Sequence, residues 1–141
     1  MRVYLASRHS RREELCHYRV DIENAGHVVT SRWLNGNYPE TEEAERQRCA
    51  LDDYEDVCAA EVLIAFTEPP RSTSSRGGRH CEMGIALGRG LGVWIVGPAE
   101  HVFCCLPQVS HYETWESAFA YLVGEDEAWE SALLSLAGED A

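Results

Sequence analysis

The sequence predicts an α/β protein, a Rossmann-like three-layer α/β/α sandwich with a five-stranded, mostly parallel sheet. Short apolar runs alternate with segments of helical periodicity along the chain, which is typical of parallel strands joined by right-handed crossover helices. The 141 residues are 45% hydrophobic and 26% charged, which suits one domain with a substantial core. Because no repeat or second domain is visible, residues 1–141 are expected to form a single domain, with an acidic helix from about 125 to 141.

The predicted elements follow from apolar periodicity and from the residues that bound each segment. Strands are expected at residues 3–6, 27–31, 62–66, 93–96 and 109–112. Helices are expected at residues 11–25, 41–59, 79–90, 114–123 and 126–136. Ser10 and Glu13 have the spacing of a capping box for the first helix, and Gly26 ends it. If the strand order is the common 2-1-3-4-5, a ligand crevice lies between the first and third strands.

The charge pattern points to a small anion as the ligand. A net charge of −12 argues against binding to a nucleic-acid polymer, which is itself an anion. All twelve basic residues are arginine, so Schiff-base chemistry and the Walker phosphate loop are excluded. A GC-rich genome would also explain the lack of lysine, but it would not explain why half of the arginines lie in two segments after the first and third strands. They are Arg8, Arg11, Arg12, Arg71, Arg76 and Arg79. This clustering predicts one phosphate-binding site.

Other features of the sequence predict a cytoplasmic protein without a metal or redox cofactor. No apolar run is long enough to span a bilayer, and no signal-peptide pattern follows Met1. The six cysteines form no C-x-x-C pair, and we interpret them as small buried hydrophobic residues in a reducing compartment.

The polar segment 67–78 is long for a connection inside a compact domain and is rich in serine, arginine and glycine. Hydroxyl groups, glycine amides and the start of a helix together make a suitable cradle for phosphate. The segment lacks the G-x-G-x-x-G spacing of a dinucleotide site. The alternative interpretation is an ordinary surface loop.

Glu82 is the most unusual carboxylate in the sequence, because it lies among apolar residues on the predicted helix 79–90. Burying a carboxylate is costly, so such a residue usually has a function. Gly84 would let another group approach it closely. Asp52 and Asp53 could bring a second carboxyl group to the same sheet edge, or they could form only a solvated acidic face. Two carboxyl groups in different environments are what glycosidic cleavage requires.

Three segments resemble the nucleoside 2-deoxyribosyltransferase superfamily, and most closely its branch of nucleoside 5′-monophosphate N-glycosidases, also called N-hydrolases. They are residues 3–6 with Tyr4, residues 51–62, and the glycine-bounded block 78–88 with Glu82, Gly84 and Ala86. The resemblance covers roughly residues 2–98. It implies that Glu82 is the nucleophile, that Asp53 protonates or orients the leaving base, and that Tyr4 hydrogen-bonds the nucleophile.

The same resemblance implies where a nucleotide binds. The 5′-phosphate is expected at the loop 7–12 and at residues 74–76, and Trp33 and Tyr38 are candidates for stacking on the base, although each also fits an ordinary core or surface position. The substrate-binding residues that follow are Ser7, Arg8, Arg11, Trp33, Ser74, Ser75, Arg76 and Gly78. The resemblance further implies an oligomer, here expected to be a homodimer.

One departure from the family pattern bears on the substrate. The transferases commonly place an aspartate six residues before the nucleophile, and this sequence has Arg76 there. An arginine at that position favours nucleotides over free nucleosides. The expected function is hydrolysis of a ribo- or deoxyribonucleoside 5′-monophosphate through a glycosyl-enzyme intermediate. The alternatives are base exchange on free nucleosides and a non-catalytic nucleotide sensor.

Overall fold

The structure is a computed structural model that describes residues 1–36, 42–70 and 77–139, with only the backbone described at 125–133 and 139. Several predicted binding residues lie outside the described residues. They are Tyr38, Arg71, Ser74, Ser75 and Arg76.

The sheet has five strands and every strand pair is parallel. The strands are β1 (Arg2–Ala6), β2 (Val28–Val29), β3 (Val62–Phe66), β4 (Gly92–Val96) and β5 (Val109–Tyr112). Their order is β2-β1-β3-β4-β5, so the expected fold class and the 2-1-3-4-5 order are confirmed. The ends of β1 and β3 therefore lie side by side, as the crevice hypothesis requires.

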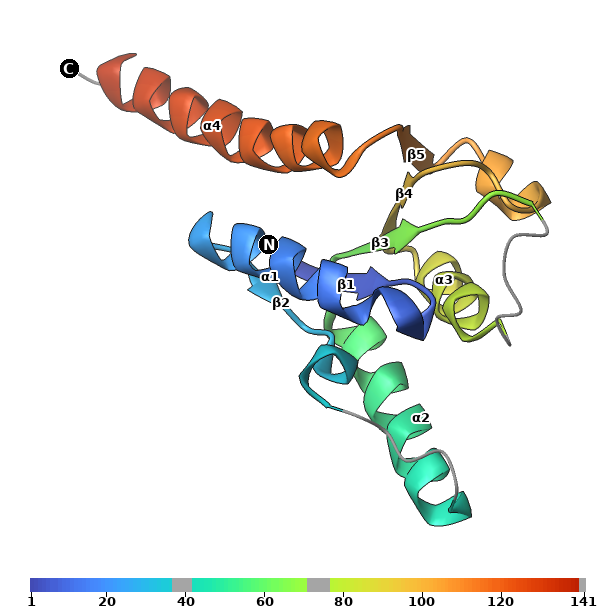
Figure 1. Cartoon of the computed structure of the whole chain (residues 1–141). Helices are drawn as coiled ribbons and strands as arrows, with labels where there is room; N and C mark the ends of the chain where they lie inside the picture. Colours follow the sequence, from blue (N-terminus) through green and yellow to red (C-terminus); the bar gives the residue numbers. More distant parts are fainter. Residues whose placement is uncertain (37–41, 71–76, 140–141) are drawn as a thin grey trace.

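Helices cover both faces of the sheet (Figure 1). They are α1 (Arg12–Asn24), α2 (Glu43–Ala59), α3 (Gly78–Gly88) and α4 (Trp115–Glu139), with short 3-10 helices η1 (His9–Arg11), η2 (Arg32–Asn35) and η3 (Val102–Cys105). Tyr18 of α1 and Trp115 of α4 both pack on Phe66 of β3, with ring centroids 5.2 and 5.9 Å from its ring. Helices α1 and α4 therefore share one face of the sheet, and α2 and α3 pack on the other.

Three local predictions are wrong. The first helix has no capping box, because Ser10 lies inside η1 and the N-cap of α1 is Arg11, which makes no side-chain cap bond. The two C-terminal helices are one continuous helix, α4, which passes through Gly124. The cysteines are not all buried: only Cys104 is, whereas Cys81 and Cys105 are exposed and the other three are half-buried.

The connections that leave β3 and β4 are held close together. Gly97 has a φ of +121°, and a Cβ atom there would lie 2.5 Å from Thr67 Oγ1, so only glycine fits. Thr67 Oγ1 donates a hydrogen bond of 2.6 Å to the carbonyl oxygen of Pro98. This close approach fixes the backbone that carries Glu68.

None of the helices within the described ranges is long and apolar enough to cross a membrane.

Candidate active site

Three predicted catalytic groups come together from three different elements. Tyr4 lies on β1 in register with Leu63, on the opposite face from Phe66 and hence toward α2 and α3. Asp53 of α2 and Glu82 of α3 both raise the pKa of the fully buried Tyr4 phenol, after burial itself as the main cause. The sheet thus brings a phenol and two carboxyl groups, Tyr4, Asp53 and Glu82, to one location.

Glu82 is held in an environment that disfavours its charged form. Burial is the main cause that raises its pKa to about 8, and the negative charge of Asp53 adds to the increase. The Tyr4 hydroxyl acts in the opposite direction, as a hydrogen-bond donor to the carboxylate would. The charged form of Glu82 is therefore disfavoured at neutral pH.

The pKa of Asp53 is set by a different balance of causes. Burial, followed by repulsion from Asp56 and Asp52, raises its pKa to about 6, while Arg32 lowers it. Arg32 lies beside α2 because its backbone N–H and its Nε atom both donate to the Asp56 carboxylate, at 2.9 and 2.8 Å. The two candidate catalytic carboxyl groups thus have divergent pKa values, with Glu82 the weaker acid of the two.

Each of the three groups has a polar atom that is buried without a hydrogen-bond partner among the described residues: Tyr4 Oη, Asp53 Oδ1 and Glu82 Oε2. Tyr4 is near enough to lower the pKa of Glu82, yet the two side chains do not complete a hydrogen bond. Buried polar atoms are nearly always paired in folded proteins. Three unpaired oxygens at one location are typical of a site that binds a polar ligand.

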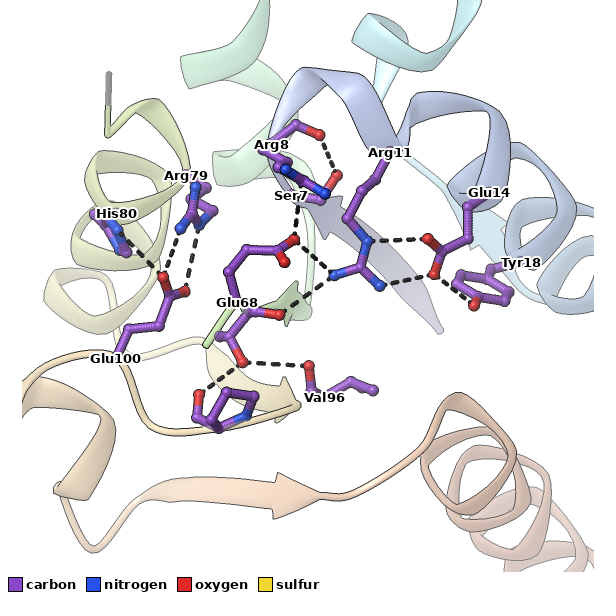
Figure 2. Close-up of polar contacts among 12 residues, drawn as sticks. Ser7, Arg8, Arg11, Glu14, Tyr18, Glu68, Arg79, His80, Val96 and Glu100 are labelled. Carbon is purple, nitrogen blue, oxygen red and sulfur yellow. Dashed lines mark hydrogen bonds and ion pairs between the residues drawn. The ribbon is translucent and has the colours of Figure 1, made fainter. Parts of the chain in front are cut away.

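The first arginine loop lies at the carboxyl ends of β1 and β3, but two of its three arginines, Arg8 and Arg11, already contact carboxylates (Figure 2). Arg11 donates to Glu14 through Nε and Nη2, at 2.9 and 2.7 Å, and to Glu68 Oε1 through Nη1, at 3.1 Å. Arg8 Nε lies 3.2 Å from the same Glu68 oxygen without the alignment of a hydrogen bond. The clustered arginines therefore do not form a free positive patch: Arg8 and Arg11 share Glu68 as a partner.

The described arginine of the second cluster also has a carboxylate partner. Arg79, in the first turn of α3, is 6% exposed and donates to Glu100 through Nε and Nη2, at 3.3 and 2.5 Å. Its Nη1 atom is buried without a partner among the described residues. Burial and, next, the charge of Arg79 lower the pKa of the neighbouring His80.

The remaining predicted binding residues have distinct positions. Ser7 donates to the carbonyl oxygen of Arg8 at 2.8 Å, and Gly78 begins α3 with open space around its Cα. Trp33 is 6% exposed and its indole N–H donates to the carbonyl oxygen of Leu5 at 2.9 Å. This position favours a packing role, and base stacking by Trp33 stays a prediction.

Sequence reasoning missed four carboxylates that shape the site: Glu14, Asp56, Glu68 and Glu100. Two of them carry a sequence signal. Glu14 lies three residues after Arg11, a spacing that pairs side chains on a helical turn, and Glu68 follows the third strand as Arg8 follows the first. No group of three or more metal-binding side chains is placed to hold an ion within the described residues.

Two solved structures share the fold of this chain, one of a 2-deoxyribosyltransferase and one of an N-glycosidase. A 2-deoxyribosyltransferase from Bacillus psychrosaccharolyticus is similar with a TM-score of 0.68 and 16% identity, over 84% of this chain and 90% of the other. A CMP N-glycosidase from Clostridium botulinum has a TM-score of 0.58 and 20% identity, over 86% of this chain and 98% of the other. No protein-family model and no curated protein matches the sequence.

Proposed function

We propose that the chain hydrolyses the N-glycosidic bond of a nucleoside 5′-monophosphate and releases a free base and a sugar phosphate. The observation that carries the proposal is the convergence of Tyr4, Asp53 and Glu82, each with a buried polar atom left unpaired among the described residues. The fold shared with a deoxyribosyltransferase and a CMP N-glycosidase supports the same class of chemistry. Arg76, six residues before Glu82 in the sequence, favours a phosphorylated substrate.

In the proposed mechanism, Glu82 attacks the anomeric carbon as the carbon–nitrogen bond breaks. The bond electrons leave with the base, which takes a proton from Asp53. Water then attacks the same carbon, gives a proton to the Asp53 carboxylate and releases Glu82. The Tyr4 hydroxyl orients Glu82 and stabilises its negative charge, consistent with its lowering of the Glu82 pKa.

The mechanism requires the carboxyl pair to hold one proton. With pKa values of about 6 for Asp53 and about 8 for Glu82, the pair holds one proton near neutral pH. Attack by Glu82 requires that this proton is on Asp53. Because Glu82 has the higher pKa, the proton lies on Glu82 in most molecules, so the productive arrangement is the minor one. A substrate that hydrogen-bonds Asp53 through its base would favour the productive arrangement.

The first test is release of free base from a panel of nucleoside 5′-monophosphates, followed by chromatography. We expect the wild type to release base from at least one, and Glu82→Ala to lower kcat/KM by about a thousandfold or more, because the nucleophile is lost. The matched control is Glu61→Gln, because Glu61 forms an exposed ion pair with Arg2 at the amino-terminal ends of β1 and β3, away from their carboxyl ends. No release from any monophosphate, or an unchanged rate in Glu82→Ala, would contradict the proposal.

A further inference from the structure

Glu68 is a buried carboxylate that the proposed mechanism does not use. It lies two residues beyond the end of β3 and is 8% exposed. Its Oε1 atom contacts both Arg11 Nη1, at 3.1 Å, and Arg8 Nε, at 3.2 Å (Figure 2). Glu68 therefore occupies two of the three arginines of the first loop.

The two arginines are held very differently. Arg11 is fixed by two bonds to Glu14, a 3.3 Å bond to the carbonyl oxygen of Thr67, and packing over the Phe66 ring at 5.6 Å. Glu14 is fixed in turn by the Tyr18 hydroxyl at 2.7 Å.

Arg8 has no comparable support. Its side chain is 38% exposed, and its buried Nε atom has no hydrogen-bond partner in the described part of the chain. The Arg8–Glu68 contact is thus the weakest of these contacts and the one that an external anion can replace at least cost.

The local charge shows what such an anion must offer. Arg8 and Arg11 contribute two positive charges, and Glu14 and Glu68 contribute two negative charges, so the described cluster is neutral. A neutral hydroxyl group cannot displace a carboxylate from an arginine. A monoanion gains little, because it brings the same charge as Glu68. A phosphate dianion brings a larger charge and three acceptor oxygens.

We propose that Glu68 is a specificity-determining residue: an internal carboxylate, held by Arg11, that occupies Arg8 and that only a dianionic 5′-phosphate displaces from Arg8. This inference rests on the proposed function for its substrate. It assigns Glu68 the role of a competitor, which weakens phosphate binding but excludes free nucleosides and monoanionic analogues. Its removal is therefore expected to strengthen phosphate binding, the reverse of what loss of an ordinary binding residue would do.

The test is Glu68→Gln, which removes the charge and keeps an oxygen acceptor for Arg11. Thermal melts with inorganic phosphate measure binding without any reaction, because a ligand that binds the folded state raises Tm. We expect the apparent Kd for phosphate to fall about tenfold in Glu68→Gln, because one charge-assisted competing contact is lost. Acetate should begin to stabilise the variant, and the KM of the cleaved monophosphate should fall by a similar factor. Glu61→Gln, the matched control, should behave as the wild type.

A Kd for phosphate that is unchanged or higher in Glu68→Gln would overturn the inference. Arg8→Gln is the second variant, and it leaves Glu68 bonded to Arg11. This variant should lose the Tm response to phosphate. A retained response would also overturn the inference. The two proposals fail separately. If no monophosphate is cleaved but Glu68→Gln binds phosphate more tightly, only the proposed function fails. If cleavage occurs but neither Kd nor KM changes, only the role of Glu68 fails.

Discussion

At the residue scale, the protonation of Asp53 and Glu82 governs when the proposed reaction can occur. Below about pH 6 both carboxyl groups are protonated, so no nucleophile is available. Above about pH 8 both are ionised, so no acid remains for the leaving base. We expect a bell-shaped plot of kcat/KM against pH with limbs near these two values, measured by initial rates of base release. A rate that keeps rising above pH 9 would contradict the assignment of an acid.

Residue-scale properties could be predicted only where the signal is local. Glu82 could be singled out because a carboxylate among apolar residues on one helix is visible in the sequence itself. The partners of the arginines could be predicted only in part. Glu14 lies three residues after Arg11, but Arg11 and Glu68 are 57 positions apart and Arg79 and Glu100 are 21 apart. A cluster of cations in a sequence is therefore a poor measure of the local field, which depends on carboxylates that folding brings in.

At the element scale, the attachment of α2 to η2 positions Asp53. The Asp56 carboxylate accepts two hydrogen bonds from Arg32, and its backbone carbonyl accepts one from Thr30 Oγ1 at 2.8 Å. Asp56→Asn replaces one buried acceptor by a donor, so we expect a loss of about 1–3 kcal/mol in the free energy of unfolding, measured in urea. The acid limb of the pH profile should also move to lower pH, because the charge of Asp56 raises the Asp53 pKa.

The control for this prediction lies on the same helix. Glu55 also contacts Arg32, at 3.1 Å, but its side chain is 66% exposed. Glu55→Gln should change the free energy of unfolding by less than about 0.5 kcal/mol. If the two substitutions lowered the free energy of unfolding equally, the burial of Asp56 would not be the reason for its contribution to stability.

Element boundaries could be predicted where apolar runs are short and bounded, as at residues 62–66, which form β3 as expected. They could not be predicted at the C-terminus, where the pattern favoured a break between 123 and 126. Helix α4 continues through Gly124 because glycine costs a helix only about 1 kcal/mol relative to alanine, which flanking helix formers offset. The missing capping box has a similar cause: a 3-10 turn at 9–11 takes up Ser10 before α1 begins.

At the scale of the whole molecule, the far end of α4 contributes little to the folded chain. Residues 134–138 are all exposed, with Leu134 at 74% and Leu136 at 61%, and this end of α4 extends beyond the sheet (Figure 1). A chain that ends at residue 133 should keep its free energy of unfolding within about 1 kcal/mol and its full activity. Leu122→Ala, at a fully buried position, should cost about 2–5 kcal/mol in the same urea titration.

A larger loss in the free energy of unfolding on truncation would mean that the terminal leucines are covered by a contact with another molecule.

The overall topology could be predicted from the alternation of strands and helices alone, because a parallel sheet with crossover helices restricts strand order to a few arrangements. The detailed site could not be predicted from local patterns, because it depends on three elements whose relative rotation no single segment encodes. Tyr4 and Asp53 are singled out only by the family resemblance.

The central position of β1 has a kinetic consequence. Its residues pair with β2 on one side and β3 on the other, so Val3 must meet Val62 across a long stretch of chain before the centre of the sheet exists. Such distant pairings make folding slower than local ones do. Tyr4, Asp53 and Glu82 come from β1, α2 and α3, so a refolding chain can regain helical circular dichroism well before it regains any ability to bind or cleave a ligand. Recovery of the proposed activity should therefore lag behind recovery of circular dichroism.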